Sequence, residues 1–239
     1  MHFFTYLCPA NKHFNHIPDM QRIFHFLQAI EAHNNREYFH AHQPEYKAAR
    51  ALFEEVTQQL ILRIAAFDDS VAYQTPKSCI YRFARDTRFS EDKSPYKRHF
   101  GAFICSHGRK SFRAGYYLHL QPGGSMVAGG SWCPPAPLLK AVRQRIVDDI
   151  DHFRAIVEAP HFHALYPVVG EDPVKTLPKG IDKAFPYPQY VRPRLYTVWQ
   201  PLPDSFVNQP DWLDQVEEKF RIMAPFNQFL NEVFDDFEE

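Results

Sequence analysis

The sequence predicts an α+β fold, in which helices pack mainly on one face of an antiparallel sheet within a single domain. Two observations favour this class. Apolar residues recur with helical spacing towards both ends of the chain, and short strand-like runs separated by turn residues occupy the middle. The 239 residues are also 45% hydrophobic and 23% charged, which is ordinary for a globular protein. Helices, then strands, then helices again are typical of α+β proteins.

The first part of the chain is predicted to be helical. Residues 1–18 show no clear periodicity, so we expect an N-terminal extension or arm and assign the domain to residues 19–239. Apolar residues within 23–30 mark a short amphipathic helix. The first asparagine and the glutamate of residues 34–37 resemble a capping box that starts the next helix. Apolar residues spaced by three and four then predict a long helix over 46–64.

The middle of the chain predicts a sheet. Residues 79–85 alternate in polarity, and residues 101–106 and 112–120 also have strand character. Gln-Pro-Gly-Gly-Ser at 121–125 is a turn signal. Residues 126–130 then return as the partner strand of a hairpin.

The last part of the chain is predicted to be mainly helical. After a Pro-rich stop, apolar residues at helical spacing predict a helix over 138–157. Residues 159–194 are expected to be ordered but irregular, and residues 195–200 are a further strand. Pro210 opens another helix, and Pro225 is expected to separate it from a last one.

Charge and cysteine content exclude several functional classes. The net charge of −1 gives no overall attraction to nucleic acid or to acidic membranes. The four cysteines are widely spaced and show no zinc-type pattern, so we expect reduced thiols, a cytoplasmic protein, and neither metal nor cofactor. No signal-peptide pattern is present, and no apolar run approaches the ~20 residues that cross a bilayer.

Basic residues are concentrated in one segment. Residues 77–113 hold ten Lys or Arg against three Asp or Glu, whereas residues 200–239 hold two against ten. The acidic end is expected to be a solvated face or to dock on a basic segment. Within the basic segment, five cations form the predicted binding group for an anion: Arg82, Arg85, Arg88, Lys93 and Lys97.

Other residues are predicted to complete this site. Asp86 is expected to orient one of the arginines, and Tyr96 supplies a further donor. His119 shares a strand face with Tyr117, which makes it the predicted general acid/base if that face turns towards the cations. Lys179 adds another cation at an unknown distance. A satisfied core histidine is the alternative interpretation of His119.

Three interpretations of the cations remain open. They form a salt-bridge network that ties a loop to the sheet, or a pocket for a small phosphate- or carboxylate-bearing ligand, possibly with enzymatic activity. In the third, segment 77–113 is the contact surface of a non-catalytic interaction module, for nucleic acid or an acidic protein. The overall charge and the absence of a recognition motif disfavour nucleic acid. We prefer the ligand pocket. Oligomeric state is not predicted.

Several motifs, taken in order, resemble one known family. Over roughly residues 20–235 the chain is similar to the family known as domain of unknown function 2461. The matching motifs are Asn-Asn-Arg-Glu-Tyr-Phe at 34–39, Arg-Phe-Ala-Arg-Asp-Thr-Arg-Phe-Ser at 82–90, Lys-Ser-Pro-Tyr-Lys at 93–97, Gly-Tyr-Tyr-Leu-His at 115–119, Gly-Gly at 129–130 and Pro-Lys-Gly at 178–180. The resemblance implies a small α+β protein. It implies no activity, cofactor or substrate, and it leaves residues 1–18 unexplained.

Overall fold

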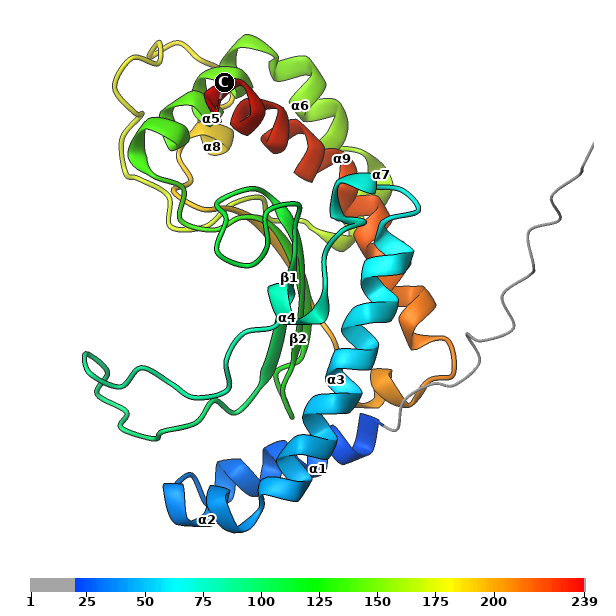
Figure 1. The fold of residues 1–239 in the computed structure, drawn as a ribbon. Coiled ribbons are helices and arrows are strands. Elements are labelled where there is room, and N and C mark those ends of the chain that lie inside the picture. The colour runs from blue at the N-terminus through cyan, green and yellow to red at the C-terminus, as the bar shows by residue number, and fades with distance from the viewer. Residues whose placement is uncertain (1–19, 239) are drawn as a thin grey trace, which may run out of the picture.

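The computed structural model describes residues 20–238, so the predicted arm at residues 1–18 lies outside the described range. Figure 1 shows the order of the elements. They are α1 (Met20–Ala32), α2 (Arg36–Ala41), α3 (Gln43–Ile64), the 3₁₀ turn η1 (Asp69–Val71), α4 (Pro76–Cys79), β1 (Phe100–Ile104), β2 (Gly115–Leu120), β3 (Met126–Ser131), α5 (Ala136–Asp148), α6 (Ile150–Val157), α7 (Pro160–Leu165), α8 (Pro188–Val191), β4 (Tyr196–Pro201), the 3₁₀ turn η2 (Asp204–Asn208) and α9 (Trp212–Glu238).

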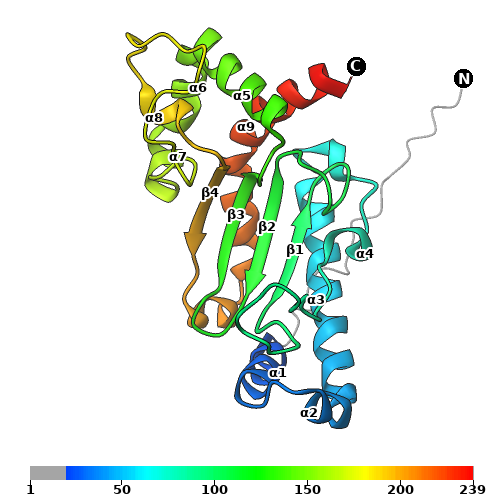
Figure 2. The same cartoon turned by 90° about the vertical axis from the view of Figure 1, so that its left-hand side faces the viewer.

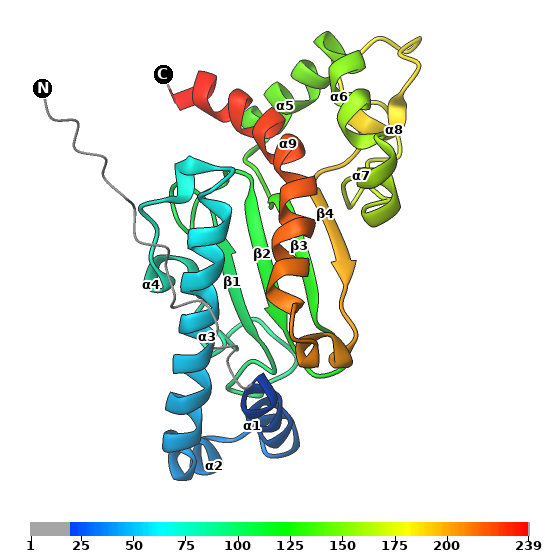
Figure 3. The same ribbon diagram turned by 90° about the vertical axis from the view of Figure 1, so that its right-hand side faces the viewer.

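The strands form one antiparallel sheet in the order β1-β2-β3-β4. Helices α3 and α9 lie side by side across one face of it (Figure 3). The predicted α+β class, with an antiparallel sheet, is therefore confirmed. The predicted hairpin is also present, since His119 of β2 lies opposite Met126 of β3. On the other side of β2, His119 lies opposite Gly101 of β1.

The hydrophobic core lies between the sheet and the two long helices. The ring of Phe53 in α3 stacks on Phe100 of β1 at 5.3 Å, and the ring of Phe220 in α9 meets Tyr116 of β2 edge-on at 5.4 Å. Each fully buried side chain of this size contributes about 1.5–3 kcal/mol. Because side chains alternate along a strand, the neighbours of these residues point to the opposite face of the sheet.

That opposite face is not covered by the long helices. Figure 2 shows the four strands from this side. In Figure 1, the segment between α4 and β1 and the group α5, α6 and α8 project from the two ends of the sheet towards this side, so that the chain has a crescent outline. Residues 117 and 119 of β2 therefore lie on the open, inner side of the crescent.

The predicted strand at residues 79–85 was wrong. Its first residue ends α4, which begins at Pro76 behind a Thr75 cap. After it, the backbone pairs only through isolated bridges, Ile80 to Ala102 and Ala84 to Tyr96. Pro95 has no N–H to donate, so the ladder between the two sides of this segment cannot continue.

Three helix predictions also differ from the structure. Residues 138–157 form two helices, because Asp149 leaves the helical conformation between α5 and α6. Pro225 lies inside the single helix α9, since the continuous apolar face on the sheet outweighs the hydrogen bond that proline removes. The cap of α2 is Asn35, which accepts from Tyr38 N, whereas the side chain of Asn34 bonds to the backbone of Tyr96.

Candidate functional site

The outer arm, which we define as residues 85–94, contains ion pairs between its own side chains. The Arg85 guanidinium donates to the carboxylate of Asp92, to Ser94 Oγ at 2.5 Å and to Ser90 Oγ at 3.1 Å. Arg88 donates to both oxygens of Asp86, at 2.9 and 2.7 Å. These hydrogen bonds hold the pKa of the Asp86 carboxyl below its usual value. The partner of Asp86 is therefore mainly Arg88, and Arg85 has a different carboxylate.

The remaining predicted residues are dispersed. Lys93 Nζ donates to the Thr87 carbonyl at 3.0 Å on the outer arm. The Tyr96 ring points into the core, where it stacks on Phe39 at 4.0 Å. Lys179 is exposed in the irregular segment between α7 and α8, and no hydrogen bond, ion pair or ring contact joins it to the other predicted residues. The structure therefore does not gather all the predicted residues at one point.

A second group gathers where the arm meets the sheet. We call it the inner cluster, and it contains two of the predicted residues, Lys97 and His119. Four further side chains contact Lys97, His119 or one another: Tyr81, His99, Tyr117 and Gln121. All six belong to β2, to its C-terminal end or to the chain that leads into and out of the arm. The inner cluster lies on the open side of the sheet.

A chain of hydrogen bonds runs along β2 through His119. Tyr117 Oη donates to His119 Nδ1 at 2.9 Å, and His119 Nε2 lies 3.1 Å from Gln121 Oε1. The Gln121 oxygen can only accept, so Nε2 carries the proton and Nδ1 accepts from the tyrosine. Burial lowers the pKa of His119 and raises that of Tyr117. The imidazole is therefore neutral at neutral pH, and the phenol keeps its proton.

His99 is a second neutral imidazole beside His119. Its ring lies 4.2 Å from the His119 ring, between centroids. Burial, with smaller contributions from His119 and Lys97, lowers the pKa of His99 to about 3. Two neutral imidazoles thus lie in contact beside an ammonium group.

Lys97 is the cation of the inner cluster. Its Nζ lies 5.2 Å from the centroid of the Tyr81 ring, an arrangement that attracts a cation. Burial, followed by the charge of Arg82, lowers the pKa of Lys97. Among the side chains that the structure describes, residues 20–236, no carboxylate lies within ion-pairing distance of Lys97 Nζ. Arg82 is exposed, and its ion pair with Asp86 is long, with 3.9 Å between Arg82 Nη2 and Asp86 Oδ2.

Gly101 makes room for this arrangement. It lies opposite His119 in the sheet, and the Tyr117 ring lies over its Cα. A Cβ at this position would lie 2.5 Å from Tyr117 Oη, which is too close for any real contact. The glycine is therefore needed for the close approach of the tyrosine to β1.

Sequence reasoning did not assign three members of the inner cluster, His99, Tyr81 and Gln121, to a site around His119, and it also missed the neighbouring Gly101. Alternation along β2 places Tyr117, His119 and Gln121 on one face, and this signal was available for the glutamine. Gly101 lies in β1 and His99 just before its first residue, so only the register of the β1–β2 pair brings them close to His119.

Within the described part of the chain, no three His, Cys, Asp or Glu side chains are arranged to hold a metal ion. No helix among residues 20–238 is both long and apolar enough to cross a membrane.

A family model described as "Conserved hypothetical protein (DUF2461)" matches residues 22–229. No curated protein and no solved structure matches the chain.

Proposed function

The chain belongs to the DUF2461 family of conserved hypothetical proteins, and from this premise we propose that it binds a small phosphate- or carboxylate-bearing molecule at the inner cluster. In this proposal Lys97 and Arg82 receive the anion, and Tyr117, His119 and His99 contact the part of the ligand beside it. The cations of the outer arm, Arg85 and Arg88, hold the arm in place.

The observation that carries this proposal is the state of Lys97. A partly buried ammonium group loses hydration, and this loss is normally offset by a carboxylate. The outer arm provides such partners for its arginines, whereas the described chain provides none for Lys97. A bound anion would supply the missing charge through a charge-assisted hydrogen bond.

His119 is the residue that we propose as acid/base if the ligand is also a substrate. Its neutral imidazole suits proton acceptance near pH 7. Both ring nitrogens are engaged in the structure, so a proton would reach Nδ1 by way of the Tyr117 hydroxyl or after that hydroxyl turns aside. The carboxylate of Asp86 is exposed and paired to Arg88, which suits a role in ordering the arm.

The test is a thermal-shift screen of the full chain against phosphorylated and carboxylated metabolites. A ligand at 100 times its dissociation constant adds about 2.7 kcal/mol to the free energy of unfolding. We expect a stabilising compound whose effect disappears in Lys97→Met and persists in Lys93→Met, a matched removal of a lysine from the outer arm. No stabilising compound, or equal effects in the two variants, contradicts the proposal.

A second candidate function is a non-catalytic interaction through the basic segment, residues 77–113. One observation favours it: the Phe89 side chain on the outer arm is 96% exposed, with the Arg88 guanidinium 5.8 Å from its ring centroid. An exposed aromatic ring beside cations suits stacking with bases or contact with an acidic protein. This function predicts that the chain binds oligo(dT), that binding weakens steeply with salt, and that Phe89→Ala abolishes it.

A further inference from the structure

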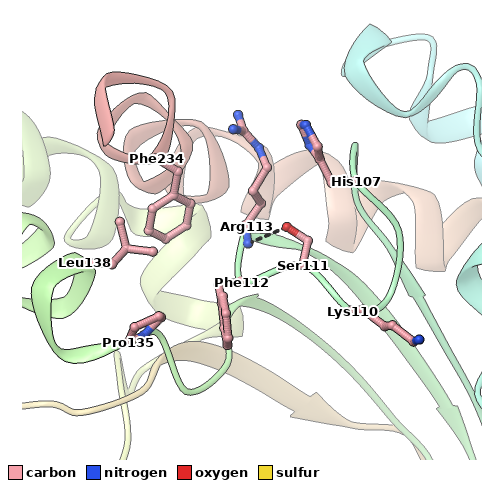
Figure 4. Close-up of a pocket in the computed structure, with 8 residues that line it drawn as sticks. All are labelled: His107, Lys110, Ser111, Phe112, Arg113, Pro135, Leu138 and Phe234. Carbon is pink, nitrogen blue, oxygen red and sulfur yellow. Dashed lines mark hydrogen bonds between the residues drawn. The ribbon is translucent and has the colours of Figure 1, made fainter. Parts of the chain in front are cut away.

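A separate cavity of about 440 Å³ lies at the other end of the sheet. Its walls come from three parts of the chain that are distant in sequence: the connection between β1 and β2, the start of α5 and the end of α9 (Figure 4). The volume is within the range of small-molecule sites, which is about 300–1,000 Å³. None of the inner-cluster residues lines this cavity.

One side of the cavity is apolar. Figure 4 shows the side chains of Pro135, Leu138, Phe234 and Phe112 gathered around the same hollow. Leu138 and Phe234 belong to the core and are fixed there, but 46% of Phe112 is exposed. A large apolar side chain left open beside an apolar wall is typical of a surface that an apolar group can cover.

The other side carries positive charge. His107 and Lys110 line the cavity from the β1–β2 connection, and none of the lining side chains that the structure describes is acidic. Among the side chains of residues 20–236, no carboxylate pairs with Lys110. Arg113 also lines the cavity, but its guanidinium points towards α9, where it donates to Asp235. We therefore do not count Arg113 among the groups available to a ligand.

Because one side of the cavity is apolar and the other is basic, we infer that it is a second binding site, for a small amphipathic carboxylate. The alkyl or aryl body would lie between Phe112, Leu138 and Phe234. The carboxylate would be held by Lys110, with the His107 imidazole beside it, in a charge-assisted hydrogen bond. Apolar walls with a few polar groups that fix orientation are the usual composition of small-molecule sites.

The direction of α5 adds to this preference for an anion. The helix begins at Ala136, directly after the lining residue Pro135, and no side chain caps its first N–H groups. The positive end of its dipole therefore lies at the edge of the cavity. This contribution is secondary to the cavity and its cation.

Octanoate is a suitable probe, because it combines an apolar chain with a carboxylate. Isothermal titration calorimetry on the full chain is expected to detect octanoate binding, weaker binding of 1-octanol, which lacks the charge, and no displacement of octanoate by inorganic phosphate, which lacks the alkyl chain. Lys110→Met should weaken octanoate binding about tenfold through the loss of a charged hydrogen bond. Phe112→Ala should weaken it about tenfold through the loss of apolar contact.

Both side chains are exposed, so these variants should keep the melting temperature of the wild type. Matched controls are Lys179→Met and Phe89→Ala, which remove an exposed lysine and an exposed phenylalanine elsewhere. Both controls should bind octanoate normally. Lys97→Met should also bind octanoate normally, so the proposal for this cavity and the proposal for the inner cluster are tested independently. The inference is overturned if octanoate does not bind, if 1-octanol binds equally well, or if the controls lose binding as much as the cavity variants.

Discussion

The outer arm and the inner cluster are adjacent in the chain but differ in how their charges are satisfied. On the outer arm, Arg85 and Arg88 each have a carboxylate partner, and these carboxylates are exposed to water. In the inner cluster, Lys97, His99 and His119 are partly or fully buried, and burial lowers the pKa of all three. The basic segment of the sequence therefore contains two kinds of site: exposed cations paired with carboxylates, and buried titratable groups without a carboxylate partner.

The difference has an energetic consequence. Exposed ion pairs contribute little to stability, because water screens them and ordering long side chains costs entropy. An ammonium group that is partly desolvated without a carboxylate partner reduces stability, and a bound anion recovers the loss. We therefore expect changes in the inner cluster to alter ligand binding, and changes on the outer arm to alter neither binding nor stability by much. Four predictions sharpen this contrast, from the largest effect to the smallest.

The largest effect is expected from Gly101→Ala. The new Cβ would lie 2.5 Å from Tyr117 Oη, so the ring must move and its bond to His119 breaks. We expect a loss of about 1–3 kcal/mol in the free energy of unfolding, as for other overpacked sites, together with loss of the ligand-dependent thermal shift. Urea denaturation measures the first effect and the thermal-shift assay the second.

The control for this prediction is the double variant Gly101→Ala/Tyr117→Phe. Removing the hydroxyl relieves the closest clash, so the two changes together should cost less than their sum. Additive costs would show that the tyrosine does not lie over Gly101.

The next effect is expected from Lys97→Met. A methionine fills similar space without a charge to desolvate, so the free energy of unfolding without ligand should be unchanged or higher. The ligand-dependent gain, about 2.7 kcal/mol at 100 times the dissociation constant, should disappear. A variant that loses stability but keeps the ligand response would instead indicate that Lys97 has a structural role.

A smaller effect concerns His99 and acid pH. Its pKa is about 3 in the folded chain against 6.5 for an ordinary histidine. Below pH 6.5 the unfolded chain therefore takes up a proton that the folded chain refuses, and stability falls as the pH falls towards 3. The slope from this residue is at most about 1.4 kcal/mol per pH unit.

Urea denaturation above and below pH 6.5 tests this expectation. His99→Gln should show a shallower loss of stability on the acid side than the wild type. An equally steep loss in the variant would mean that other groups cause the acid sensitivity.

The smallest effect is expected from Arg85→Ala on the outer arm. It removes a hydrogen-bonded ion pair with an exposed aspartate, so the melting temperature should change little, and less still at high salt. The ligand response should remain. If Arg85→Ala abolishes the ligand response while Lys97→Met leaves it intact, the binding site lies on the outer arm.

The sequence predicted the features that depend on local chemistry. The turn at residues 121–125 and the alternation along β2 were sufficient for the hairpin and for the shared face of Tyr117 and His119. The prediction failed where distant contacts decide. Packing on the sheet keeps α9 helical through Pro225. The path of the outer arm brings Arg85 next to Asp92, so that these two residues form an ion pair.

The candidate site shows the same limit. Arg82, Lys97 and His119 could be named from residue type, but their proximity depends on the register of β1 against β2 and on the path of the arm. His99 gave no signal of its own, because its contact with His119 exists only across that register.

The most direct test of the account is a phosphate titration followed by NMR of the His119 and His99 rings. An anion at the inner cluster favours the protonated imidazoles, so we expect both ring resonances to move and both pKa values to rise with added phosphate. The same titration of Lys97→Met should leave them in place. Ring resonances that stay fixed while the amides of Ser90 and Ser94 move would place the anion on the outer arm and contradict the account.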